Sequence, residues 1–389
     1  MFIDHQVAQK IVTRAMKIIE HNVNVMNHLG EIVGSGDEQR IGSFHTGALN
    51  VLSRKSKIGF DTQQANALTG VQQGLNLPIV YNGEIIGVVG ITGKPNDVSK
   101  YADLVVMTSE LMVEQSAISA QVQWDKRQQE NVICRLIQGD IEKSSLFDDR
   151  IERLNIDLNI PRIAVVIDVR SAQTQQDLPL ATLQSILRLL DNNNAYKLLA
   201  ITCPTQIVIL KPIKLKSDQW DEEQTQVQLE HLCELLAKHY QLHFKVSTGQ
   251  YFPHLTGLAK SYRSALQVLS AGKQSLPDNV LYSPKALALD VILNDQLNNW
   301  SADKVLAGYQ KLAANDKKGV LVKTLNVFFH HNADFGLTAN ALHIHRNTLR
   351  YRLDKIDHIL NIQLSNIDDL MQLYFASKLA TLKLGSTQH

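Results

Sequence analysis

Cysteine is scarce in this sequence, and the three that occur, Cys134, Cys203 and Cys233, stand far apart. None forms a CxxC pair or stands at zinc-ligand spacing from histidine, so the sequence predicts neither a disulfide framework nor a metal site. Adjacent histidines such as His330 and His331 do not alter this, because no carboxylate or cysteine lies at ligand spacing from them. We therefore expect no metal and no cofactor.

Long apolar runs and an excess of one charge are also missing. Nowhere do about 18 apolar residues follow one another, as a membrane helix requires, and the N-terminus with Asp4 is unlike a secretion signal. We expect a cytoplasmic protein with no membrane partner. Because 39 Lys and Arg face 38 Asp and Glu, any affinity for nucleic acid has to come from a local cluster.

The length of 389 residues predicts several domains, and the first pattern is that of a small α+β domain over residues 1–96. A helix is expected over 5–20, then a hairpin over 22–34, a helix over 43–54, and a second hairpin. Asn82-Gly83 is a strong turn signal between the apolar strands 78–81 and 84–92 of this second hairpin.

Residues 97–140 are expected to form a long helical connector. Between 98 and 138 there is no proline or glycine, so one or two helices are predicted, spanning roughly 60 Å at 1.5 Å per residue. Two interpretations stay open, since this segment either packs on its neighbours or forms a dimerising coil with irregular heptads.

An α+β domain is predicted over 141–285 and an all-helical one over 286–389. The expected strands are 162–169, 198–202, 206–210 and 244–249, and the expected helices are 180–190, 222–239 and 257–271, followed by a turn-rich stretch over 275–285.

Residues 338–357 have the spacing of a helix-turn-helix. A short helix over 338–342 and a link over 343–345 precede a second helix over 346–356. On this second helix Leu349, Leu353 and Ile356 share one face and are expected to pack against Leu342 and Ile344.

The opposite face carries side chains suited to the DNA major groove. Arginine can bind guanine and asparagine can bind adenine, while threonine and tyrosine can bind phosphate or a thymine methyl. The alternative is an ordinary solvated basic helix, but the helix-turn-helix context favours operator DNA, gripped by a homodimer on two half-sites. The predicted DNA-binding residues are His345, Arg346, Asn347, Thr348, Arg350, Tyr351 and Arg352.

The stretch LHIHRNTLRYRLDKI resembles the C-terminal helix-turn-helix of the purine-catabolism and carbohydrate diacid regulators. VNVMNHLGEIVGSGDEQRIGSFHTGAL, GVQQGLNLPIVYNGEIIGVVGITG and KYADLVVMTSELMVEQS resemble the sugar-diacid recognition domain of the diacid regulators. The resemblance covers essentially the whole chain. It implies a PAS-like sensor for a small hydroxylated acid, a degenerate cyclase-like middle domain, and activation of genes for glucarate, galactarate and glycerate use.

The residues of the first domain offer donors that a carboxylate needs, namely a cation, hydroxyls and free backbone N–H groups. Ser43 is expected to open a helix whose N-terminus suits an anion, with His45 on its first turn. For Arg40 and His45 the alternative is a surface or turn-stabilising role. Gln73, Gly74 and Asn76 have amide groups or positions suited to close the other side of the pocket, and helix-capping or turn roles are the alternative for them. The predicted ligand-binding residues are Ser35, Gly36, Arg40, Ile41, Gly42, Ser43, His45, Gln73, Gly74 and Asn76.

Motifs of catalysis are not found. GxSxG, the P-loop, HExxH and the Rossmann glycines have no match in a plausible setting, and no GGDEF occurs. We expect no enzyme activity. The alternatives are an enzyme of carbohydrate acid metabolism or a cyclic nucleotide cyclase, which would need catalytic carboxylates, and a purely structural scaffold.

Overall fold

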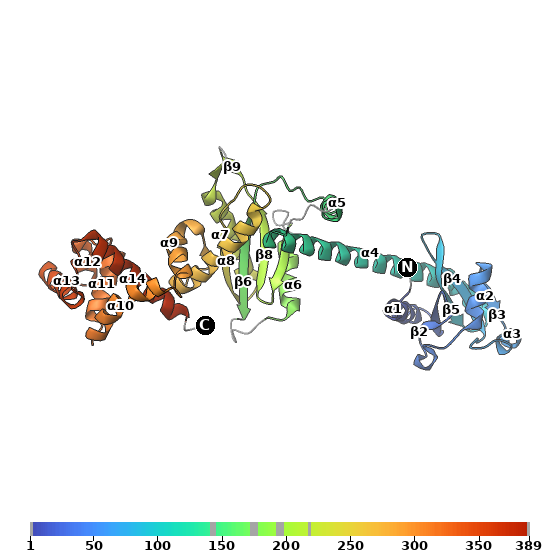
Figure 1. Ribbon diagram of the computed structural model, residues 1–389. Coiled ribbons are helices and arrows are strands. Elements are labelled where there is room, and N and C mark those ends of the chain that lie inside the picture. Colours follow the sequence, from blue (N-terminus) through green and yellow to red (C-terminus); the bar gives the residue numbers. More distant parts are fainter. Residues whose placement is uncertain (1–2, 141–144, 172–177, 192–197, 217–218, 387–389) are drawn as a thin grey trace. The chain divides into compact units, whose positions relative to one another are not determined.

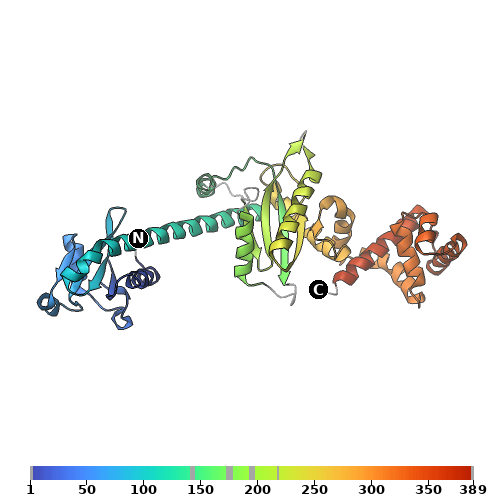
Figure 2. The ribbon, with the colours of Figure 1, turned by 180° about the vertical axis from the view of Figure 1, so that it is seen from behind.

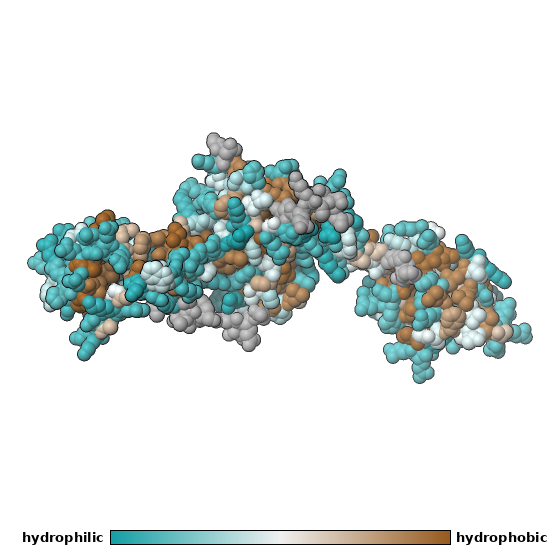
Figure 3. Space-filling view, in the orientation of Figure 1, coloured by the Kyte–Doolittle hydropathy of each residue, from teal (hydrophilic) through white to brown (hydrophobic). Residues whose placement is uncertain are grey.

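The computed structural model describes residues 3–140, 145–171, 178–191, 198–216 and 219–386. It divides into two compact units, residues 1–126 and 127–389, and the division falls inside one helix. No helix among the described residues is long and apolar enough to cross a membrane. The face seen in Figure 3 is mostly hydrophilic, with smaller hydrophobic areas between.

The first unit is built on a five-stranded antiparallel sheet in the order β2-β1-β5-β4-β3. Its apolar residues separate onto two faces, as the alternation along a strand requires. Val25, Leu77 and Val89 pack with α1 and the start of α4, while Met26 and Val88 pack with α2. The elements are α1 (His5–Met16), β1 (Val23–Asn27), β2 (Ile32–Ser35), a 3₁₀ turn (Glu38–Arg40), α2 (Thr46–Arg54), β3 (Ile58–Phe60), α3 (Thr62–Asn66), β4 (Gly74–Tyr81) and β5 (Glu84–Thr92). Both predicted hairpins are confirmed.

Two boundaries in this unit correct the sequence analysis. The helix expected to open at Ser43 begins at Thr46, because the Ser43 hydroxyl donates to Arg40 O (2.6 Å) within a turn and His45 caps the helix instead. β4 begins at Gly74 rather than 78. It continues through Pro78 because β3 pairs only with residues 74–76, so beyond them β4 is an edge strand, where proline is tolerated.

The predicted connector is a single 44-residue helix, α4 (Pro95–Gln138). Its first part belongs to the core of the first unit through Val98, Ala102 and Val105. Its last part belongs to a core of the second unit through Val132 and Leu136. The predicted boundaries at 96 and 140 stay a prediction.

The middle of the chain is a second five-stranded sheet in the order β12-β11-β6-β8-β7. Helices α6 and α7 pack on one face of it, and α8 packs on the other, as Figures 1 and 2 show. The turn-rich stretch after residue 275 contains a strand that the sequence analysis missed, β12, which pairs with β11 in parallel. The elements are α5 (Ser145–Arg153), β6 (Arg162–Ser171), α6 (Leu180–Asp191), β7 (Leu199–Cys203), β8 (Gln206–Pro212), β9 (Leu215–Lys216), β10 (Gln219–Trp220), α7 (Glu222–His239), β11 (Leu242–Thr248), α8 (Gly257–Ser275) and β12 (Leu281–Tyr282).

From residue 284 onward the described chain is helical, as predicted. Two small cores hold these helices, one around Leu325, Phe328 and Leu349 and another around Leu306 and Leu382. The helices are α9 (Pro284–Asp295), α10 (Trp300–Asn315), α11 (Val320–His330), α12 (Phe335–Ala341), α13 (Arg346–Leu360) and α14 (Ile367–Ser386). The α+β multidomain prediction is confirmed.

Candidate ligand site and DNA-binding surface

A row of polar side chains crosses the sheet of the first unit at one level. Ser35 pairs with Asn24, Asn24 with Gly90, and Gly90 with Asn76, so all four positions point to the same face, the one that α2 covers. The Ser35 hydroxyl donates to Asn24 Oδ1 (2.6 Å). Gly90 lets the Asn76 side chain lie close against the strand between the two asparagines, since a Cβ there would lie 2.6 Å from Asn76 Oδ1.

Asn76 is the residue of this row that points most directly to a bound ligand. It is only 5% exposed, and its Nδ2 has no hydrogen-bond partner among the described residues. A buried amide donor without a partner costs about 1 to 3 kcal/mol, so such an atom points to a bound group that would satisfy it.

His45 faces this row from the start of α2. Gly47 brings the two together, because a Cβ on it would lie 3.0 Å from both Asn76 Nδ2 and the His45 ring. His45 Nδ1 accepts a hydrogen bond from the Ala48 N–H (3.1 Å), which caps the helix. Burial, and then the nearby Arg40 charge, lowers the pKa of His45 to about 4. The ring is therefore neutral near pH 7, and its proton lies on Nε2, because Nδ1 is the acceptor.

Arg40 closes the site from a neighbouring turn. Its guanidinium donates to Gly70 O (2.7 Å) and to Gln72 Oε1 (3.2 Å), which ties the loop before β4 over His45. Gly70 permits this approach with φ +74°, since a Cβ there would lie 2.1 Å from Phe44 O. Burial lowers the pKa of Arg40, and Asp37 opposes this. We call Asn24, Arg40, His45, Gly47, Asn76 and Gly90 the polar sensor site.

The structure brings some of the predicted ligand-binding residues together and leaves others at the surface. It brings Arg40, His45 and Asn76 together and puts Ser35 in the same polar row. Gly36, Gly42 and Ser43 are exposed, Ile41 and Gln73 are half-exposed, and Gly74 pairs with Phe60 at the start of β4. Sequence reasoning missed Asn24, Gly47 and Gly90. A polar residue within the apolar strand 23–27 was the signal available for Asn24.

The depressed pKa of His45 gives a prediction on acid stability. Between its ordinary pKa of 6.5 and about 4, the unfolded chain binds a proton at His45 that the folded chain does not. Stability from this residue is thus present above pH 6.5 and lost as the pH falls toward 4. His45→Asn keeps a capping acceptor and removes the titration. Thermal unfolding from pH 7 to 4.5 should show a shallower decline for this variant, and parallel declines would contradict the assignment.

The C-terminal unit contains the predicted helix-turn-helix. α12 is capped by Asp334, whose carboxylate accepts from the Leu337 N–H (2.7 Å), and a left-handed residue, His343 (φ 53°), turns the chain toward α13. His345 caps α13 by accepting from the Asn347 N–H (3.2 Å). The predicted buried face is confirmed, since Leu349, Leu353 and Ile356 are buried in one core with Leu342 and Ile344 packed against them.

The opposite face of α13 is open to solvent. Tyr351 is 67% exposed, and the other exposed residues at the start of the helix are His345, Arg346, Asn347, Thr348 and Arg350. Arg352 differs from them, because it is half-buried and donates to Thr324 Oγ1 of α11 (3.2 Å). This hydrogen bond directs Arg352 toward its own domain. We call His345, Arg346, Asn347, Thr348, Arg350 and Tyr351 the recognition face.

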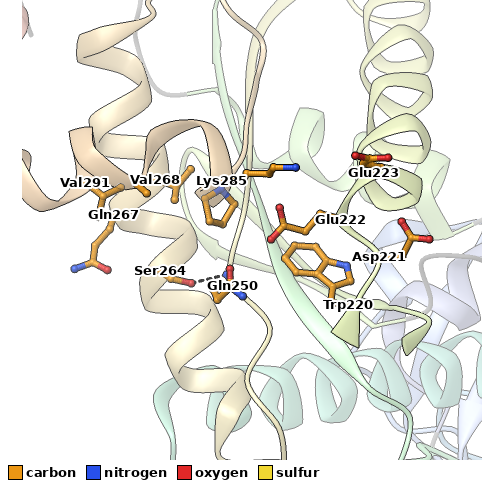
Figure 4. Close-up of a pocket in the computed structure, with 12 residues that line it drawn as sticks. Trp220, Asp221, Glu222, Glu223, Gln250, Ser264, Gln267, Val268, Lys285 and Val291 are labelled. Carbon is orange, nitrogen blue, oxygen red and sulfur yellow. Dashed lines mark hydrogen bonds between the residues drawn. The ribbon is translucent and has the colours of Figure 1, made fainter. Parts of the chain in front are cut away.

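A groove of about 710 Å³ in the second unit is acidic, in contrast to the basic recognition face. Its lining carries the three acids Asp221, Glu222 and Glu223 and one cation, Lys285 (Figure 4). Across the groove the Gln250 N–H donates to the Ser264 hydroxyl (2.8 Å). The excess of acids disfavours a carboxylate ligand here, which leaves the polar sensor site as the better place for one.

A sensor domain with a built polar site, joined in one chain to a helix-turn-helix with an open basic helix, defines a DNA-binding transcription regulator. Residues 3–136 match a family described as sugar diacid recognition, 138–271 a GGDEF-like domain, and 321–379 the PucR C-terminal helix-turn-helix domain. The chain belongs to the carbohydrate diacid regulator family. It is 40% identical to the carbohydrate diacid regulator of Escherichia coli (strain K12) over 97% of this chain and 98% of that protein.

Two other relatives also align over nearly their full length. An uncharacterized protein of Haemophilus influenzae is 34% identical over 97% of this chain and all of its own, 100%. The protein YsfB of Bacillus subtilis is 25% identical over 97% of this chain and 98% of its own. The similarity thus extends across all parts of the chain, including the GGDEF-like domain.

Proposed function

We propose that this protein activates genes for the uptake and catabolism of glucarate, galactarate and glycerate when a small hydroxylated acid binds the polar sensor site. The unpartnered, buried amide of Asn76 carries this proposal, together with the His45 Nε2 donor and the Arg40 cation beside it. These three supply hydrogen-bond donors for hydroxyls and a charge for a carboxylate. Ser35, Gly36, Ile41, Gly42, Ser43, Gln73 and Gly74 are its remaining proposed contacts.

Arg40 also offers a way to couple binding to a change in the protein. In the structure its guanidinium holds Gly70 O and Gln72. A ligand carboxylate would compete for the same donors, so the bound and free states would differ in how the loop before β4 is held. A ligand shifts such an equilibrium only by its difference in affinity for the two states.

At the other end of the chain, the recognition face is proposed to enter the major groove of an operator in the cytoplasm. One helix contacts few bases, so two copies on paired half-sites are proposed, which makes the protein a homodimer. Arg352 is kept as a predicted contact with the DNA backbone, secondary to its bond with Thr324.

The competing function is an enzyme, and the second unit offers no support for it. A cavity of about 500 Å³ is lined by the buried carboxylate of Asp168. Lys273 Nζ lies 2.6 Å and Arg170 Nε 3.5 Å from this carboxylate, so it is paired rather than set out as a base or metal ligand. No group of three metal-ligating side chains occurs within the described ranges. We propose that the middle domain is not catalytic.

Thermal-shift measurement tests the acid-sensing proposal. At a ligand concentration about 100 times Kd, binding stabilises the folded state by about 2.7 kcal/mol, so glucarate, galactarate or glycerate should raise the unfolding temperature by several degrees. Asn76→Leu should abolish the shift, because leucine cannot donate. If none of the acids shifts the wild type while operator DNA still binds, the acid-sensing proposal is wrong and DNA binding stands.

A further inference from the structure

An exposed apolar stripe runs along residues 104–122 of α4. Its five side chains are between 41 and 58% exposed, and their spacing of 3, 4, 7 and 4 residues puts them on one face of the helix: Leu104, Met107, Leu111, Ile118 and Val122. The opposite face holds Val98, Ala102, Val105 and Val113, which are buried in the core of the first unit. The sensor therefore covers one side of α4 and leaves this stripe open.

The two edges of the stripe differ in charge. One edge is acidic, with Asp103 and Glu114 exposed beside the apolar residues. The other edge, at Gln115 and Ser119, borders a groove of about 930 Å³ between α4 and α1. The α1 wall of this groove is basic and exposed, and it carries Lys10, Arg14 and Lys17.

We infer that this stripe binds the same stripe of a second copy of the chain, with the two α4 helices parallel. Apolar residues that repeat about every 3.5 positions are what two such helices need to pack together. About a twofold axis along parallel helices, the acidic edge of each copy meets the basic α1 wall of the other. In an antiparallel pair, acidic edges would face each other, which costs free energy. The charge pattern thus selects both the partner and its direction.

Between Leu111 and Ile118 the stripe lacks an apolar residue, and the polar Glu114 and Gln115 lie at its two edges there. Polar residues next to such a gap fix register at some cost in stability. This pairing assigns a specific surface to the homodimer proposed above. It rests on the proposed function only in its purpose, which is to present two recognition faces to paired half-sites. Self-association itself can be measured without DNA.

Sedimentation velocity of the full chain tests the surface. We expect the wild type to be a dimer and Leu111→Glu to be a monomer at the same micromolar concentration, because two buried glutamates would face each other. Leu29→Glu is the matched control, since Leu29 is nearly as exposed as Leu111 (58% against 56%) but lies in the turn between β1 and β2. It should remain a dimer. A monomeric wild type, or a Leu111→Glu dimer with unchanged Kd, would overturn the inference.

A charge exchange tests the direction of the helices. Glu114→Arg should weaken dimerisation about tenfold, and adding Arg14→Glu in the same chain should restore most of it. Failure of the second change to restore the dimer would overturn the parallel arrangement. Leu111→Glu should still bind a DNA duplex that carries a single half-site. Loss of this binding as well would instead count against the proposed DNA-binding function.

Discussion

Replacing Arg350 with alanine should weaken binding to the specific operator about 5- to 150-fold, which corresponds to a loss of about 1 to 3 kcal/mol. The side chain is exposed on the recognition face one turn after Arg346, while its neighbour Leu349 anchors the helix in the core. A bidentate arginine contact with guanine is worth this much discrimination. Fluorescence anisotropy at fixed salt, with specific and scrambled duplexes, measures both affinities.

Arg188→Ala is the control for this experiment. Arg188 is exposed at the end of α6, so its removal takes away the same charge from the middle domain. We expect operator affinity to stay within twofold of the wild type. If Arg350→Ala behaves like Arg188→Ala, Arg350 does not contact the operator. If it weakens specific and scrambled DNA equally, it contacts phosphate rather than a base.

Replacing Arg40 with alanine should abolish binding of the effector acid and leave the operator affinity of the unliganded protein unchanged. The variant loses the cation of the polar sensor site and also the two hydrogen bonds that hold Gly70 and Gln72. Arg40 is half-buried, and a hydrogen bond to a charged group contributes about 1.5 to 3 kcal/mol, so its loss should weaken binding about 10- to 150-fold. Titration calorimetry with the acid that gives the largest thermal shift measures this loss.

Arg54→Ala serves as the control, because Arg54 is an exposed residue in the last turn of α2, and its removal changes the charge of the sensor equally. It should bind the acid as the wild type does. Wild-type affinity in Arg40→Ala would show that the ligand does not use this guanidinium. A loss of operator affinity in Arg40→Ala would show that the substitution affects the structure beyond the sensor domain.

Much of the architecture could be predicted from the sequence because its signals are local. Asn82-Gly83 fixes a hairpin turn, the absence of proline and glycine marks α4, and the spacing of Leu349, Leu353 and Ile356 marks the buried face of α13. Short elements were missed. β3 has three residues and β12 has two, and such strands depend on pairing with a distant neighbour rather than on their own pattern.

The sensor site could be predicted only in part, for the same reason. Arg40, His45 and Asn76 were expected, but their meeting depends on sheet register, which pairs Asn76 with Gly90 and Gly90 with Asn24. Nothing in the sequence says that the Asn76 side chain lies against Gly90. Likewise, Ser43 has good capping chemistry, yet the turn uses its hydroxyl and His45 becomes the cap. Arg352 has the sequence position of a DNA contact, and a tertiary hydrogen bond to Thr324 redirects it.

The buried amide of Asn76 bears on which acids the sensor can refuse. A pocket lined only by apolar groups distinguishes similar molecules weakly, whereas a pocket with an unsatisfied donor penalises every molecule that lacks an acceptor at that point. Asn76 Nδ2, without a partner among the described residues, is such a donor. Analogues of the effector that lack the hydroxyl at this point should therefore bind far more weakly than the loss of one hydrogen bond alone would explain. Selectivity among metabolites would then depend on hydroxyl position rather than on chain length.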